Sequence, residues 1–244
     1  MFFLYRPIIR WAARRALVGR NRDRNRSARG RFTRVEVDHY LDEAWRRYKA
    51  LAPSLPPEPT VGSRMNVNLA ALTISIFQVL LDSGIERAYA IELVSDTTWK
   101  VYRQWGRIGQ FLERVLPRAL VKPMRNETDL KRRVRKDGTV VLNFPFNPPG
   151  YLAKYVPTKD ALGFDMIRCP VAQVFRAQGA ADLCRASWCD LDYALGEMQG
   201  IQLQRTTTLV EGADRCDFRL FFAPPAANRR SNDEREQEIL SQGD

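Results

Sequence analysis

The stretch ALGFDMIRCPVAQVFRAQ, residues 161–178, decides the fold. Its first nine residues predict a β-strand that ends at Cys169. Pro170 follows directly, and proline suits the first turn of a helix, so a helix is expected from Pro170 to Gln178. A strand that leads at once into a helix indicates a sheet with helices interposed between its strands.

The flanking sequence extends this pattern in both directions. Downstream, residues 181–198 predict a helix, and residues 201–210 and 215–222 predict two strands of a hairpin. Upstream we expect helices over 38–51, 68–84 and 85–116 and a strand over 138–147, with a proline-rich linker over 53–59. The predicted fold class is therefore α+β: N-terminal helices followed by a small, mostly antiparallel sheet with interposed helices.

Positive charge is concentrated at the N-terminus. Residues 1–34 contain eleven arginines and one acid, Asp23, so they carry ten of the chain's net eleven positive charges. We therefore expect a basic, largely disordered or membrane-surface arm over 1–34, a single domain over 35–223, and a polar disordered tail over 224–244. The arm suggests an anionic membrane surface as a partner. The nearly neutral body disfavours nucleic acid, and the oligomeric state stays open.

The rest of the composition indicates a cytoplasmic protein, at most peripheral to the inner face of a membrane. Arg6 and Arg10 interrupt the start of the chain before a secretory signal could form. The longest apolar run, 68–81, contains Thr73, Ser75 and Gln78, which favours a core helix over a membrane span. Without export, the four cysteines are expected to be reduced.

Cys169 is the first candidate for chemistry. At the N-terminus of a helix, unpaired backbone N–H groups and the helix dipole lower the pKa of a thiol and favour the nucleophilic thiolate. The alternative is a small cysteine that packs at a tight junction.

The segment DLCRASWCDLDY, residues 182–193, supplies the second group of candidates. On one continuous helix, Asp182, Cys189 and Tyr193 share a stripe, and Asp192 lies on the same side. Cys184 is five residues before Cys189, about 140° round an α-helix, so the two are expected to diverge. An acid beside a thiol can exchange protons with a substrate. An amphipathic helix with solvated aspartates is the alternative.

The predicted hairpin supplies the third group. In a strand over 215–222, Cys216 lies on one face, whereas Asp217 and Arg219 share the other. Arg205 on the partner strand or Arg219 could hold a substrate carboxylate. A cross-strand ion pair on the solvent face explains the same pattern.

The spacing of the four cysteines lacks the pairs typical of zinc or iron–sulfur sites, so we expect no metal and no cofactor. The single histidine, His39, lies far upstream and disfavours a Cys–His catalytic pair.

The block from Cys169 to Arg219 resembles the L-2-amino-thiazoline-4-carboxylic acid hydrolase family. The resemblance rests on Cys-Pro opening a helix, Cys189 with Asp192, an Arg-Thr strand at 205–206, and Gly212 followed by Cys216-Asp217-Phe218-Arg219. It implies hydrolysis of a small, carboxylate-bearing cyclic amidine or thiazoline-like ring to an N-carbamoyl amino acid. Asp182 stands where the family pattern suggests glutamate.

Two function classes remain open. The leading hypothesis is an enzyme in which Cys169, Cys189, Asp192, Cys216 and Asp217 carry the chemistry. In this hypothesis the residues that bind the small-molecule substrate are Arg205, Arg219, Asp182 and Tyr193. The alternative is a non-catalytic ligand- or protein-binding module that its basic arm tethers to a membrane surface.

Overall fold

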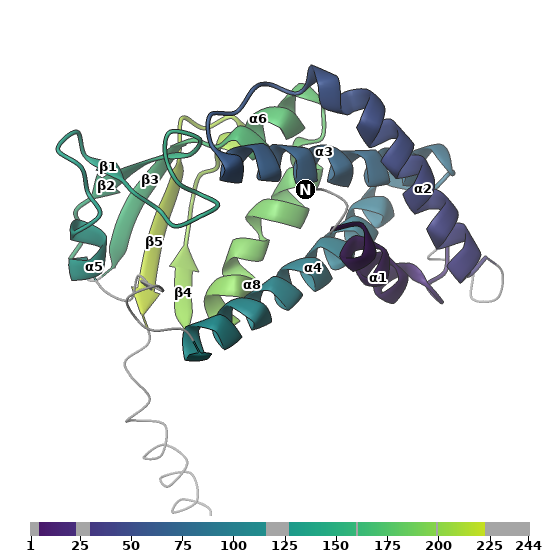
Figure 1. Ribbon diagram of the computed structural model, residues 1–244, viewed down its shortest axis with the longest axis horizontal. Coiled ribbons are helices and arrows are strands. Elements are labelled where there is room, and N and C mark those ends of the chain that lie inside the picture. The colour runs from purple at the N-terminus through teal and green to yellow at the C-terminus, as the bar shows by residue number, and fades with distance from the viewer. Residues whose placement is uncertain (1–4, 23–29, 116–126, 160, 199, 223–244) are drawn as a thin grey trace, which may run out of the picture.

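The computed structural model describes residues 5–22, 30–115, 127–159, 161–198 and 200–222; the side chains of 105–127 lie outside this description. N-terminal helices are followed by an antiparallel sheet with interposed helices, which confirms the predicted α+β class. Figure 1 shows the sheet at one end of the molecule and the long helices at the other, with α8 lying between β4 and α4. The predicted tail over 224–244 lies outside the described residues.

The helical part uses four long N-terminal helices and shorter ones within the sheet region. The first group is α1 (Tyr5–Leu17), α2 (Arg34–Leu51), α3 (Val61–Asp82) and α4 (Arg87–Val115). The later helices are α5 (Glu127–Lys131), α6 (Pro170–Ala177), α7 (Ala181–Cys184) and α8 (Leu191–Met198). Short helical turns lie at η2 (Ala52–Ser54), η3 (Arg185–Cys189) and η4 (Leu209–Glu211).

The sheet has five antiparallel strands in the order β1-β2-β3-β5-β4. The strands are β1 (Thr139–Val140), β2 (Leu152–Val156), β3 (Leu162–Arg168), β4 (Ile201–Gln204) and β5 (Cys216–Phe222). β2 was not predicted, and the strand expected over 138–147 shrinks to β1, since its remainder forms a proline-rich loop. The hairpin is confirmed, but its first strand ends at Gln204, so Arg205 lies in the connecting loop.

Helix α3 lies at the centre of the helical part and packs against α2, α4 and α6. It is the one described helix that is long and apolar enough to cross a membrane by length and composition, and 67% of that apolar stretch is buried inside the protein. Thr73 and Ser75 satisfy their hydroxyl groups within the helix, on the carbonyls of Leu69 and Ala71. These contacts are typical of the core helix that the sequence predicted.

Helix α1 packs against the rest of the domain, so the expectation of a separate, largely disordered arm is wrong for residues 5–17. Ile9, Ala13 and Leu17 recur every four residues and form a buried stripe of α1 that packs in the hydrophobic core. The abundance of arginine hid this stripe, because the arginines occupy the other faces of the same helix. Residues 23–29 of the expected arm lie outside the described residues.

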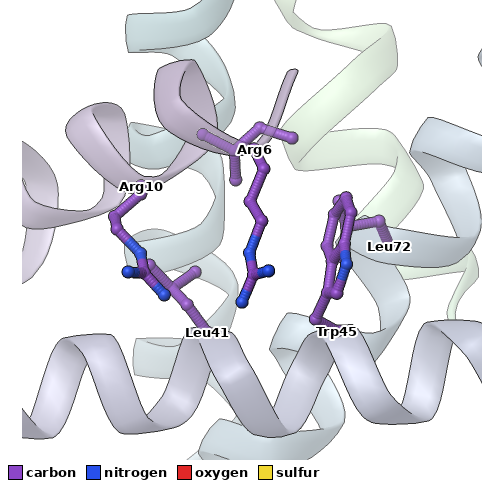
Figure 2. A pocket seen from close by; sticks show the side chains of 6 residues that line it. Arg6, Arg10, Leu41, Trp45 and Leu72 are labelled. Carbon is purple, nitrogen blue, oxygen red and sulfur yellow. The ribbon is translucent and has the colours of Figure 1, made fainter. Parts of the chain in front are cut away.

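The arginines of this segment pair with acids of the domain. Arg14 binds Asp38 of α2, with Nη2 to Oδ2 at 2.6 Å, and Arg6 binds Asp42 at 2.8 Å. Figure 2 shows Arg6 and Arg10 reaching from α1 toward Leu41 and Trp45 of α2. Much of the positive charge is therefore neutralised locally, and the interaction with an anionic membrane stays a prediction.

Two neighbouring side chains test whether α1 is part of the fold. Leu17 is 3% exposed and Val18 is 43% exposed. We expect Leu17→Ala to lower the free energy of unfolding by about 2–5 kcal/mol, the usual cost of a large-to-small change in a core. Val18→Ala should change it by no more than about 0.5 kcal/mol, as for most surface positions. Urea unfolding of both variants measures this, and equal, negligible effects would mean that α1 is detached.

Candidate active site

Cys169 is positioned by the junction between β3 and α6. It is the N-cap of α6 in an extended conformation, and Pro170 opens the helix as predicted. The backbone N–H groups of Val171 and Ala172 favour its thiolate, although neither completes a capping hydrogen bond to the sulfur. The strand–helix junction expected from residues 161–178 is therefore present, with the thiol at the end of the helix.

The protonation state of Cys169 differs from the expectation. Burial away from water raises the pKa of the thiol to about 12, with Cys189 and Cys216 adding to the rise, and the N–H groups offset only part of it. A charged sulfur is costly to bury, and here that cost exceeds the effect of the helix terminus. Cys169 is therefore a neutral thiol in the resting protein.

The helix expected over 181–198 is interrupted by one π-helical turn, Arg185–Cys189. The N–H of Asp190 donates to the carbonyl of Arg185, five residues back, at 2.9 Å. The wider turn brings residues five apart toward the same side, so Cys184 and Cys189 interact: burial raises the pKa of Cys184, and Cys189 raises it further. The expectation that these cysteines diverge is therefore wrong, because it assumed a regular α-helix.

A buried ion pair lies immediately beyond this turn. Arg205 Nη1 donates to Asp192 Oδ2 at 3.0 Å, and Nη2 donates to the carbonyl of Cys189 at 2.9 Å. The side chain of Arg205 is 1% exposed, whereas that of Asp192 is 39% exposed. The guanidinium lies over the rings of Tyr193 and Phe218, 5.2 Å from each centroid. The structure thus presents an accessible carboxylate on a buried cationic support.

Two atoms of this pair have unused hydrogen-bonding capacity. Arg205 Nε is buried and has no hydrogen-bond acceptor among the described residues. Oδ1 of Asp192 accepts no hydrogen bond from them either, since Arg205 bonds only Oδ2. Unpaired buried donors are rare, and a bound ligand or water is the usual explanation.

Although 39% of the Asp192 side chain is exposed, the protein around it displaces much of its water, and this partial desolvation raises its pKa to about 6, against the lowering effect of Arg205; the nearby charge of Asp190 raises it further. A carboxyl group with this pKa is mostly ionised at neutral pH and can both accept and return a proton. It has the properties of a general base.

Cys216, the first residue of β5, faces the same interior. The N–H of Leu209 donates to its Sγ at 3.2 Å, and Arg205 lowers its pKa, but burial dominates and raises the pKa to about 11. When ionised, Cys169, Cys189, Asp192 and Arg205 are each close enough to shift the pKa of Cys184 or Cys216. These six residues therefore lie close together, and we call them the thiol cluster.

The aromatic residues beside the thiol cluster were not among the predicted site residues. Tyr102 of α4 is half-buried; its partial desolvation raises its pKa well above the usual range, and the charges of Asp192 and three of the cysteines add to the rise. Its ring meets Trp188 edge-on at 5.8 Å. The hydroxyl group of Tyr151 accepts a 2.8 Å hydrogen bond from Asn66. Burial raises the pKa of Tyr151, and the charge of an ionised Cys169 would raise it further. In the sequence these rings are indistinguishable from core aromatics at helical or strand spacing.

Three predicted site residues have structural partners outside the thiol cluster. Asp182 forms a two-bond ion pair with Arg87 on the surface, at 2.7 and 2.8 Å. Arg219 contacts Asp165 at 2.9 Å. Asp217 accepts hydrogen bonds from Thr206 and Thr207; burial opposes them, but together they hold its pKa well below the usual range.

The alternation of β5 explains part of this separation. Cys216 and Phe218 point to the helical side, so Asp217 and Arg219 point to the other face. Tyr193, in contrast, joins the cluster from α8: its hydroxyl donates to the carbonyl of Arg205 at 3.1 Å, and its ring lies beneath the guanidinium. The structure thus brings together Cys169, Cys189, Cys216, Asp192, Arg205 and Tyr193.

No group of three or more His, Cys, Asp or Glu side chains is arranged to hold a metal ion within the described part of the chain. All four cysteines are free thiols.

The fold and the site define an α+β protein with a buried thiol–carboxylate cluster. Residues 110–220 match the model of the L-2-amino-thiazoline-4-carboxylic acid hydrolase family. The match confirms the resemblance that the cysteine block suggested, and it includes every member of the thiol cluster. Searches of curated proteins and of solved structures found no match.

The raised thiol pKa values predict low reactivity at neutral pH. Each cysteine lies in its own tryptic peptide, so mass spectrometry resolves iodoacetamide labelling at every site. We expect Cys169 and Cys216 in the folded protein to react slowly at pH 8 and faster up to at least pH 10, since the thiolate is the reactive form. The same cysteines in urea supply the control, with midpoints near 8.5. A midpoint below 8 at Cys169 in the folded protein would contradict the neutral-thiol description.

Proposed function

We propose that the protein is a hydrolase that opens a small, carboxylate-bearing cyclic amidine or thiazoline-like ring and releases an N-carbamoyl amino acid. The family match supports hydrolysis of a thiazoline-like substrate. The observation that carries the proposal is the accessible Asp192 carboxylate, held by buried Arg205 at 3.0 Å inside a cluster of thiols.

Asp192 is the general base of this proposal. Its Oδ1 takes a proton from a water molecule as the water oxygen bonds to the ring carbon between sulfur and nitrogen. The amidine enters protonated, so the addition gives a neutral tetrahedral adduct. The adduct then collapses: the carbon–sulfur bond breaks, the proton on Asp192 passes to the departing sulfur, and the added hydroxyl group loses its proton to solvent as it becomes the carbonyl of the product. A carboxyl group whose pKa is about 6 suits both transfers.

In this mechanism the thiols line the site and do not attack the substrate. Direct attack by Cys169 requires loss of a proton from a group whose pKa is about 12. Activation of water by Asp192 avoids this cost, so we assign the attack to water and keep Cys169, Cys189 and Cys216 as the walls of the site. A protonated amidine beside these thiols would lower their pKa, which leaves covalent attack as the competing route.

Arg205 supports Asp192 and supplies the positive potential of the thiol cluster. Its Nε, which is buried and lacks an acceptor among the described residues, is the donor that we assign to the carboxylate of the substrate; binding there requires the side chains that cover this nitrogen to move. Arg219 is the other arginine considered for this role, and its contact with Asp165 on the opposite face of β5 makes it the less favourable choice.

Asp192→Asn tests the assignment. The amide keeps the shape of the side chain but cannot accept the proton, so we expect kcat to fall by about 10²-fold or more. In the unaltered protein, kcat/KM should rise as the pH increases through about 6, because the base works when ionised. Asp82→Asn is the matched control, since Asp82 is exposed, pairs with Arg47 at 2.6 Å and, among the described residues, has no contact with the thiol cluster.

The assay uses L-2-amino-thiazoline-4-carboxylate and related carboxylate-bearing cyclic amidines, with the N-carbamoyl product measured by mass spectrometry. Full activity of Asp192→Asn would remove the general base and favour covalent attack by a thiol. Tight binding without turnover across the panel would contradict the hydrolase proposal and favour the ligand-binding module.

A further inference from the structure

We propose that Cys184 and Cys189 form a reversible disulfide when the protein meets a peroxide. This modification site does not depend on the proposed hydrolysis. It rests on the π-helical turn, which places two thiols of one segment side by side within a reduced protein.

The turn supplies the required proximity. In a regular α-helix, side chains five residues apart diverge by about 140°. The i-to-i+5 hydrogen bond from Asp190 N–H to the carbonyl of Arg185 widens the backbone by one residue, and this brings the side chains of Cys184 and Cys189 toward the same side of the turn. Because the thiols belong to one turn, no movement of separate elements is needed to join them.

The two thiols differ in access, and this sets the order of the reaction. Cys184 is 1% exposed and belongs to the core, whereas Cys189 is partly exposed. A peroxide therefore oxidises Cys189 first: its sulfur gains one oxygen to become a sulfenic acid, and the peroxide is reduced to water or an alcohol. The sulfur of Cys184 then attacks the sulfenic sulfur, and the hydroxyl group leaves as water with the proton from Cys184.

The other thiols are held in different elements. Cys169 lies at the junction of β3 and α6, and Cys216 lies at the start of β5 with its sulfur bonded by Leu209 N–H. Neither shares the π turn, so the sulfenic acid at Cys189 should meet Cys184 first. The carbonyl of Cys189 also accepts from Arg205, so the modified turn adjoins the support of Asp192.

Trypsin provides a direct test. It cleaves after Arg185 and separates the two cysteines into the peptides 177–185 and 186–205. The full-length protein is treated with one to five equivalents of hydrogen peroxide, the excess is removed, and free thiols are blocked with iodoacetamide in urea before digestion without reductant. We expect the two peptides to be joined and to separate after dithiothreitol, while Cys169 and Cys216 remain alkylated.

Serine variants supply the controls. Cys184→Ser should leave the sulfenic acid at Cys189 open to capture by dimedone, a reagent specific for that group, and Cys189→Ser should show neither disulfide nor dimedone adduct on Cys184. Cys169→Ser, which spares the turn, should keep the 177–185 to 186–205 link. Absence of the link in the unaltered protein, or a dominant link to Cys169 or Cys216, would overturn the proposal. The outcome is read without an activity assay, so it is separate from the fate of the hydrolase proposal.

Discussion

The buried guanidinium of Arg205 is the constraint on which the candidate site depends. A charge that is 1% exposed must be compensated inside the protein, and here Asp192 and the carbonyl of Cys189 provide the compensation. These two partners belong to α8 and to the π turn, whereas Arg205 follows β4. The pair therefore joins the sheet to the interposed helices at the point where the thiols gather.

The same burial sets the chemistry of the surrounding groups. Removal from water raises the pKa of Cys169 and Cys216, and it raises the pKa of Asp192 in spite of the cation beside it. In the proposed hydrolysis, the raised pKa of Cys169 and Cys216 beside a carboxyl group with a pKa near 6 favours activation of water over attack by a thiol. This is why the proposed mechanism uses water and a general base, although the sequence drew attention to the cysteines.

Local sequence patterns predicted most of the helices and strands but not the irregular turns within them. The Cys-Pro junction, the order of helices and strands, and the hairpin all follow from residues next to one another in the sequence. The π turn at Arg185–Cys189 adds one residue to a helix whose composition is ordinary, so the meeting of Cys184 with Cys189 had no visible signal. The contribution of Tyr102 was hidden for a different reason, since it comes from a helix far from the cysteine block.

Charge counting misled in the same way at the N-terminus. Ten net positive charges in residues 1–34 suggested a largely disordered or membrane-surface arm, yet the acids that Arg6 and Arg14 contact are on α2, and only the folded chain brings them together. The apolar stripe of α1 was present in the sequence as Ile9, Ala13 and Leu17.

The ionisation of Asp192 is the most direct test of the account. Carbon-13 NMR of the aspartate carboxyl groups, with Asp192→Asn used to assign the resonance, measures its titration in the folded protein. We predict a midpoint near pH 6, raised from the ordinary 3.8 by partial desolvation. A midpoint below 4 would contradict it, because Asp192 would then be a solvated partner of Arg205 with little capacity as a base at neutral pH.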